Sequence, residues 1–115
     1  MEQKEIFEKL ANVTLKSVEN ISNWYKAILY IERQEKSVGF KSSYLNEKEE
    51  EIFIDTEADY FTSKAVQELY KLTQSHNLTH INWNKAKFII DSKNKIDIEY
   101  YRDENWQNEV DNLES

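Results

Sequence analysis

The spacing of hydrophobic residues changes several times along the first half of this chain, and each change predicts a different element. Over residues 3–21 apolar residues recur at three- and four-residue intervals, which indicates an amphipathic helix. Residues 24–34 are apolar on both faces, which is typical of a central strand covered on at least one side. Residues 38–45 carry apolar side chains on even positions, as a half-buried strand does, and Gly39 indicates a bulge or a close backbone approach.

The middle of the chain predicts a short element followed by a second helix. Residues 52–54 are three apolar residues in a charged context and form either a short strand or an anchored loop. A helix is expected to begin near Thr62 or Ser63, because either hydroxyl can cap it. Its apolar stripe continues toward Asn77, where we expect it to stop.

The last third predicts a second hairpin. Residues 85–91 and 95–102 both alternate between apolar and polar side chains, and a Ser-Lys-Asn turn at 92–94 joins them. Asn94 suits this turn because asparagine tolerates the left-handed conformation. Residues 104–115 are acidic with a weak helical spacing, so they form either a mobile acidic tail or a short helix.

The two predicted hairpins begin alike. Trp24-Tyr25-Lys26-Ala27 resembles Trp83-Asn84-Lys85-Ala86, and each follows a predicted helix, so the match is either a structural repeat or chance. The order helix–hairpin–short strand–helix–hairpin predicts one α+β domain over residues 1–115. It would hold an antiparallel sheet of four to five strands with two main helices packed on one face. The predicted core comprises Phe7, Leu10, Leu29, Ile31, Phe40, Leu69, Phe88, Ile90 and Ile98, with Trp24 and Trp83 largely buried.

Composition narrows the chemistry. The 115 residues include no cysteine and one glycine, which excludes disulfides, thiolate zinc sites and a glycine-rich phosphate loop. His76 and His80 have a metal-compatible spacing, but the helix is expected to end between them, so we interpret them as loop histidines. No serine, histidine and acid form a recognisable catalytic motif. We therefore expect no enzyme activity, no cofactor and no metal.

The N-terminal sequence and the charge suggest where the protein works and what it binds. The first residues lack the apolar core of a signal peptide, and the longest apolar run is too short to cross a bilayer, so we expect a cytoplasmic protein. The net charge of -7 disfavours direct nucleic-acid binding and favours a basic protein partner. Acidity for solubility alone is the other interpretation.

The densest charge lies between Glu47 and Asp59, where seven acidic residues accompany a single lysine. No glycine is available for a calcium loop, and a paired-carboxylate hydrolase would need a larger cleft. The segment is either a solvated loop or an acidic docking surface with aromatic anchors. The predicted partner-binding residues are Glu49, Glu50, Glu51, Asp55, Glu57, Asp59 and Tyr60, and the second choice is Asp103, Glu104, Trp106 and Glu109.

Two segments carry a family resemblance. The first segment is the amphipathic N-terminal helix together with residues 23–30, Asn-Trp-Tyr-Lys-Ala-Ile-Leu-Tyr. The second segment is the second predicted helix together with residues 83–88 and 95–103. Together they resemble the YezG-like antitoxin and immunity family over most of residues 5–105. Such proteins protect bacteria against polymorphic nuclease toxins, including contact-dependent inhibition toxins.

The resemblance implies a function. It implies an immunity protein that acts as a monomer in a 1:1 complex with a DNase or RNase toxin, whose basic substrate-binding surface it covers. Toxin-contacting residues vary within such families, so the resemblance transfers none. An acidic adaptor or regulator, or a small hydrolase, is the alternative.

Overall fold

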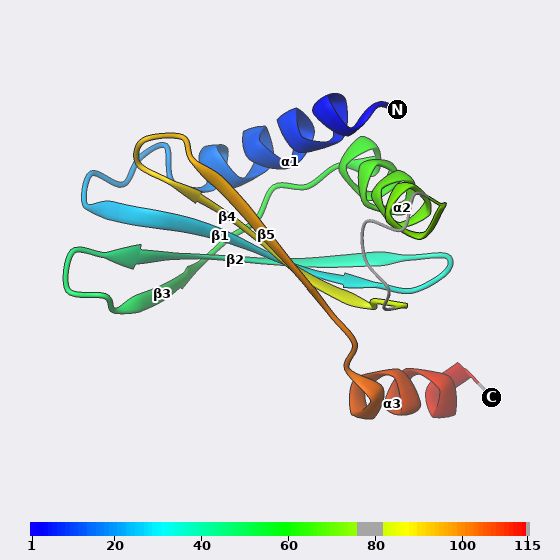
Figure 1. The fold of residues 1–115 in the computed structure, drawn as a ribbon. Helices are drawn as coiled ribbons and strands as arrows, with labels where there is room; N and C mark the ends of the chain where they lie inside the picture. The colour runs from blue at the N-terminus through cyan, green and yellow to red at the C-terminus, as the bar shows by residue number, and fades with distance from the viewer. Residues whose placement is uncertain (76–81, 115) are drawn as a thin grey trace.

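The computed structural model describes residues 1–75 and 82–114 and confirms the predicted α+β fold. Five antiparallel strands form one sheet in the order β3-β2-β1-β4-β5. Three helices accompany them (Figure 1). The elements, in chain order, are α1 (Gln3–Ser17), β1 (Trp24–Arg33), β2 (Val38–Asn46), β3 (Glu51–Ile54), α2 (Tyr60–Ser75), β4 (Lys85–Asp91), β5 (Ile96–Tyr101) and α3 (Glu104–Glu114).

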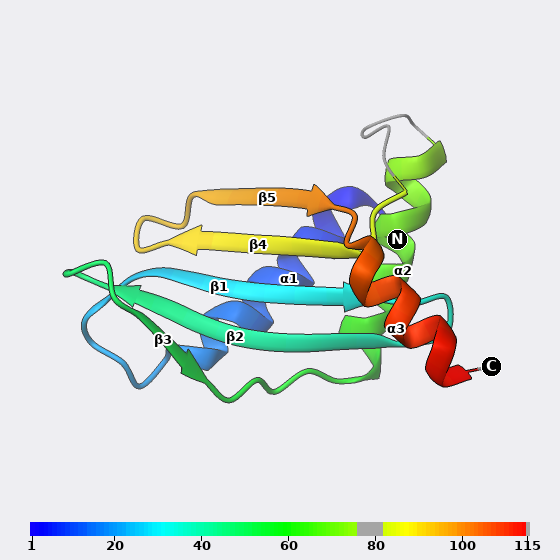
Figure 2. The same cartoon turned by 90° about the horizontal axis from the view of Figure 1, so that it is seen from below.

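The two longer helices cover one face of the sheet. Figure 1 shows α1 and α2 on the same side, whereas α3 lies on the opposite side. Seen from that opposite side, α3 crosses the end of the sheet where β1 ends and β4 begins (Figure 2). No other described element lies over this side, which we call the open face.

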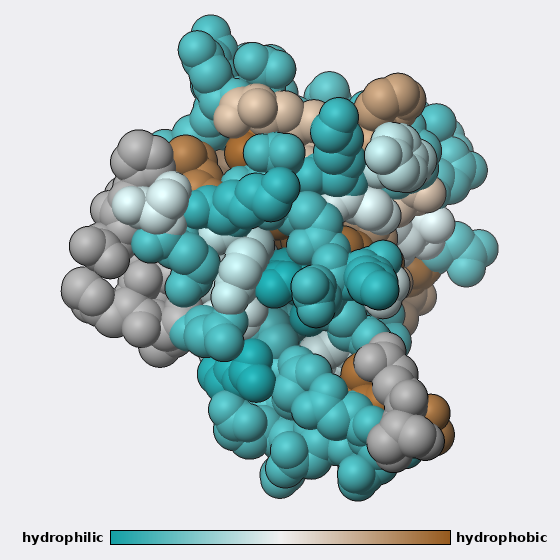
Figure 3. All heavy atoms as spheres, turned by 90° about the vertical axis from the view of Figure 1, so that its right-hand side faces the viewer, coloured by the Kyte–Doolittle hydropathy of each residue, from teal (hydrophilic) through white to brown (hydrophobic). Residues whose placement is uncertain are grey.

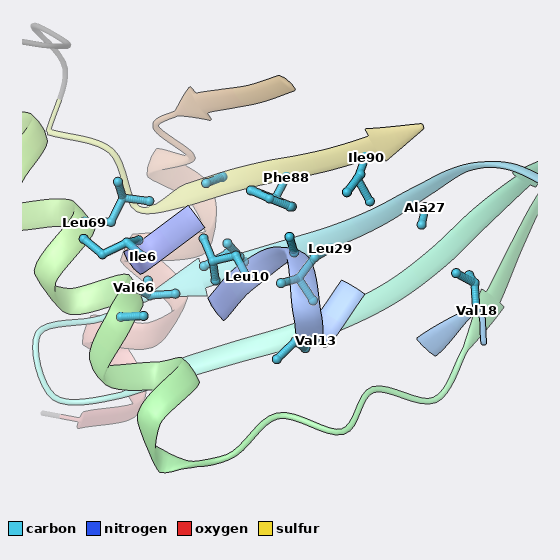
Figure 4. Close-up of a cluster of buried hydrophobic side chains, with 14 of the residues drawn as sticks. Ile6, Leu10, Val13, Val18, Ala27, Leu29, Val66, Leu69, Phe88 and Ile90 are labelled. Carbon is cyan, nitrogen blue, oxygen red and sulfur yellow. The ribbon is translucent and has the colours of Figure 1, made fainter. Parts of the chain in front are cut away.

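The core lies between α1, α2 and the central strands because alternate residues of β1 and β4 face the helices. The β1–β4 register pairs Leu29 with Phe88, and both side chains are fully buried. Helix α1 adds Leu10 and Val13 from one stripe, and these side chains point toward the sheet in Figure 4. The buried cluster comprises Ile6, Leu10, Ala11, Val13, Val18, Ala27, Leu29, Ile31, Tyr44, Ala65, Val66, Leu69, Trp83, Ala86, Phe88 and Ile90.

Trp83 joins α2 to the second hairpin. Its side chain is 0% exposed, and its indole Nε1 donates a hydrogen bond of 2.9 Å to Thr73 Oγ1. The rings of Tyr70 and Tyr100 lie 5.4 and 5.1 Å from the indole, centroid to centroid. A buried indole N–H needs a hydrogen-bond acceptor, and Thr73 provides it as well as packing against the ring.

Four of the predicted core residues are only partly buried, so these predictions were wrong in degree. Phe40 and Ile98 face the helix side, but from β2 and β5, beyond the strands that the helices cover best. Phe7 lies beside the core, with its ring edge against Phe88 at 6.0 Å. Trp24 is half-buried, unlike Trp83, because β1 begins with a register irregularity between Trp24 and Lys26.

Two helix boundaries also differ from expectation. Helix α1 ends at Ser17, and the chain turns so that Val18 and Ile21 pack from the turn. Their three-residue spacing suits a turn as well as a helix. Helix α2 begins at Tyr60, because the cap is Asp59: its Oδ1 accepts the backbone N–H of Thr62 at 2.9 Å. Asn77, the predicted stop, lies outside the described residues.

The predictions for the remaining segments have mixed outcomes. Residues 52–54 belong to a true strand, β3, and the last residues form the short helix α3. Asn94 has φ 65°, which confirms the left-handed turn. Gly39 was misinterpreted: it pairs in register with Glu32, its φ is not positive, and an added Cβ would meet only the Glu32 Cβ at 4.0 Å.

We predict that Thr73→Val destabilises the protein by about 1–3 kcal/mol, because the buried Trp83 N–H loses its acceptor. The measurement is urea unfolding followed by circular dichroism. In a Trp83→Phe background, which has no N–H to satisfy, the same Thr73→Val change should cost much less. Equal costs in both backgrounds would contradict the role of this hydrogen bond.

Candidate binding surface

The acidic segment lies along one edge of the sheet. It runs from the β2–β3 turn through β3 and the linker to the first turn of α2, and we call residues 47–61 the β3 edge. Asn46 organises the turn: its Oδ1 accepts the backbone N–H groups of Lys48 at 2.9 Å and Glu50 at 3.0 Å. Glu49 sits at φ 61° in this turn with its side chain exposed. The predicted residues therefore lie along one chain segment, which contains the edge strand β3 and extends beyond both of its ends.

Glu51 uses its carboxylate within the protein. Its Oε2 accepts hydrogen bonds from Tyr30 Oη at 2.5 Å and Ser43 Oγ at 2.7 Å on the open face. These bonds, Tyr30 first, lower the pKa of Glu51. Burial, followed by the bond to Glu51, raises the pKa of Tyr30 to about 12. Glu51 therefore holds β3 against the neighbouring strands.

Glu57 and Asp59 also have partners, and these tie the linker to α1. Glu57 Oε2 lies 3.1 Å from Lys16 Nζ, and this contact raises the pKa of Lys16. Asp59 lies 3.8 Å from Lys9 Nζ and caps α2, and the bonds from Thr62 lower the pKa of Asp59. Because both ion pairs are largely exposed, their main effect is to fix the path of the linker.

Three of the predicted carboxylates remain accessible to a partner. Glu49, Glu50 and Asp55 are exposed, and Glu50 contacts only its own turn through Asn46 Nδ2 at 3.1 Å. Among the described residues, Glu49 and Asp55 make no side-chain hydrogen bond or ion pair. The structure thus divides the predicted set into carboxylates that have partners elsewhere in the protein and carboxylates that have none beyond their own turn, although Glu57 and Asp59 are largely exposed as well.

Large apolar side chains share this edge. Phe53 is 61% exposed, Tyr60 73% and Phe61 57%, which are high values for aromatic residues. Phe53 stacks on Tyr30 at 6.0 Å between ring centroids, and Tyr60 meets Phe61 edge to face at 5.6 Å. By contrast, the side that carries α2 and α3 is mainly hydrophilic in its described part, with apolar groups in small separate spots (Figure 3). Exposed aromatics beside free carboxylates are typical of a protein-binding surface.

The second predicted cluster attaches α3 to the sheet. Asp103 Oδ1 caps α3 by accepting the Trp106 backbone N–H at 3.0 Å, and its Oδ2 pairs with Lys85 Nζ at 3.0 Å. The backbone bond and then Lys85 lower the pKa of Asp103. Lys85 Nζ also lies 5.3 Å from the ring centroid of half-buried Trp106. Glu104 pairs with Arg102 at 2.8 Å, whereas Glu109 is exposed.

Sequence reasoning missed the neighbours of Glu51 and the role of Lys85. Alternation shows that Tyr30 belongs to the even positions of β1 and Ser43 to the odd positions of β2, but only the strand pairing brings them to one carboxylate. A hollow of about 230 Å³ on the open face lies beside them. It is lined by Tyr30, Ile31, Glu32, Lys41, Phe53, Lys85 and Tyr101.

Other chemistry finds little support in the described structure. Across residues 1–75 and 82–114, no three His, Cys, Asp or Glu side chains gather as a metal site would require. His76 and His80 lie outside these ranges. None of the described helices is both long and apolar enough to cross a membrane.

Comparison with known proteins adds no assignment. No protein-family model matches the chain, and a search of curated proteins finds no match. The resemblance to the YezG-like family therefore stays a prediction from sequence.

We predict that Glu51→Gln weakens the dependence of the free energy of unfolding on pH at acid pH. The folded pKa of Glu51 is lowered, so its contribution is present well above its ordinary value of 4.5 and is lost as the pH falls toward the folded value. Tyr30→Phe, which keeps the ring but removes the donor, should weaken this dependence in the same direction. The measurement is urea unfolding between pH 3 and 7, about the range where carboxyls titrate. A pH dependence unchanged by Glu51→Gln would refute this role.

We predict that Lys85→Met loosens α3 without unfolding the sheet. The substitution removes the contacts to Asp103 and Trp106 but keeps an apolar stem of similar length. Amide hydrogen exchange in α3 should accelerate by about tenfold, the scale of one charge-assisted hydrogen bond, while β1 and β4 stay protected. Lys87→Met is the matched control, because Lys87 lies over Tyr30 and not over α3. Equal protection of α3 in both variants would argue against the role of Lys85 in attaching α3 to the sheet.

Proposed function

We propose that this protein binds and neutralises a cognate bacterial nuclease toxin by covering the toxin's basic substrate-binding surface. The observation that supports the proposal best is the β3 edge, where free carboxylates and exposed aromatic rings lie along one segment of the chain. The family resemblance indicates the class of partner, and the net charge of -7 indicates that the partner is positively charged.

The chemistry of inhibition is simple. A nuclease holds phosphates with lysine and arginine side chains, and carboxylates such as Glu49 and Asp55 can accept hydrogen bonds from the same donors. Aromatic anchors such as Tyr60 supply apolar area that charge alone does not. Long-range attraction also speeds association, so the association rate should fall as salt rises.

Co-expression tests the function directly. The toxin to test is a nuclease domain encoded by a neighbouring gene, and cells that produce it should survive only when this protein is also present. If the neighbour is harmless and this protein instead binds a host protein, the adaptor class is correct and the immunity proposal fails.

We predict that reversing three free carboxylates abolishes protection. Glu49→Lys, Glu50→Lys and Asp55→Lys together should weaken toxin binding by about a hundredfold or more, because like charges then face the basic surface. Glu51, Glu57 and Asp59 stay unchanged, since they have partners within the protein. Binding is measured by calorimetry at low and physiological salt.

The control for this reversal alters the same amount of charge elsewhere. The substitutions Asp97→Lys, Glu99→Lys and Asp111→Lys change exposed carboxylates on β5, the opposite terminal strand of the sheet, and on α3. Thermal melts check that both triple variants fold. If the β3-edge variant folds and still protects cells, the binding surface lies elsewhere, and the α3 cluster with Glu109 is the next candidate.

A further inference from the structure

The outer side of β3 presents backbone groups that the sheet does not use. In the described sheet, β3 pairs with β2 alone. The Asn46 N–H donates to the Glu50 C=O at 3.1 Å, which fixes the phase of this antiparallel ladder. Because hydrogen-bonded pairs alternate, Ile52 and Ile54 bond toward β2, whereas the backbone N–H and C=O groups of Glu51 and Phe53 point outward.

This edge lacks several of the features that block strand pairing, although β3 is short, with 4 residues, and begins with Glu51. Natural edge strands are protected by short length, charged residues and lysine in particular, proline, a bulge or a covering element. β3 contains neither lysine nor proline, its ladder to β2 is regular, and α1 and α2 lie over a face of the sheet and not along this edge (Figure 2). Ile52 is 38% exposed and Phe53 61%, so both faces of the strand also offer apolar contact.

Charge identifies the occupant. Acidic residues flank β3 on both sides, with Glu49 and Glu50 before it and Asp55 and Glu57 after it. A second copy of this chain would pair about a two-fold axis and place these acidic flanks against each other, which disfavours self-association. A basic extended segment would instead meet carboxylates at both ends.

The opposite edge of the sheet does not fit the same occupant. β5 is also a terminal strand, but Lys93 and Lys95 precede it, and Arg102, which follows it, is paired with Glu104. A basic strand would meet Lys93 and Lys95 at the turn end of β5, whereas carboxylates stand at both ends of β3, so the two edges of one sheet differ in the partner that they favour.

We propose that a basic, extended segment of the protein partner adds to the outer side of β3 as a sixth strand. This inference rests on the proposed function and specifies how the partner is held. Backbone hydrogen bonds to Glu51 and Phe53 supply the strand pairing, and alternate side chains of the incoming strand contact Phe53 on the open face. Glu49, Glu50 and Asp55 accept its lysine and arginine groups.

The first experiment uses a synthetic twelve-residue peptide in which lysine or arginine alternates with valine. Amide exchange of the full-length protein is followed by NMR with and without this peptide. The outward amides of Glu51 and Phe53 should slow by about tenfold or more at saturation, while the outward amides of β5, at Ile96 and Ile98, stay unchanged. An absence of binding, or binding without protection of the β3 amides, overturns the inference.

The second experiment separates the backbone from the side chain. Phe53→Ala and Phe53→Pro both remove the ring, but only proline also removes the outward N–H, and proline is tolerated at that position of an edge strand. Peptide binding by Phe53→Pro should be about tenfold weaker than by Phe53→Ala. Ile98→Ala and Ile98→Pro form the matched pair on β5 and should bind equally well.

These outcomes are distinguishable from failure of the proposed function. If cells survive the toxin but Phe53→Ala and Phe53→Pro bind alike, the protein is an immunity protein that uses side chains alone. If the neighbouring nuclease is never neutralised yet the β3 amides are protected by the basic peptide, the edge is a strand-binding site for a different partner. If Phe53→Pro does not fold, amide protection in the unmodified protein decides.

Discussion

The pairing of β1 with β4 is the contact on which the rest of the structure depends. It joins strands that belong to separate hairpins and places Leu29 against Phe88 beneath both covering helices. Each hairpin then extends outward from this ladder, so β3 and β5 become the two edges. The helices pack here because the helix-facing side chains of β1 and β4 are apolar and match the apolar stripes of α1 and α2. The exposed edge of β3 is thus a consequence of the central pairing.

The sequence predicted the elements well because hydrophobic period is a local property. Both hairpins and the two main helices followed from spacing, whereas residues 52–54 could be read as either a short strand or an anchored loop. Degree of burial was harder, since it depends on where a strand stands in the sheet: Phe40 and Leu29 are both large apolar residues of predicted strands, but only Leu29 lies on the central strand. Caps were ambiguous because Asp59 and Thr62 both qualify by residue type.

The candidate surface was predictable in position but not in detail. Composition alone marks the acidic segment between Glu47 and Asp59. What a charge count does not reveal is that Glu51 binds Tyr30 and that Glu57 pairs with Lys16, because both partners are distant in sequence. The acidic segment therefore has two functions at once: some carboxylates set the course of the chain, and their neighbours are left free in solvent.

The order of pairing along the chain also bears on how the protein folds. The β1–β2, β2–β3 and β4–β5 ladders are closed by short turns, so each can form from nearby residues. The β1–β4 ladder must instead close a loop that runs at least from Glu32 to Lys85 and contains β2, β3 and α2. Closing a long loop costs entropy before any contact compensates for it, which makes such non-local pairing slow. Docking of the two hairpins should therefore limit the folding rate, and until it occurs both sides of the β1–β2–β3 meander are open to pairing with other chains.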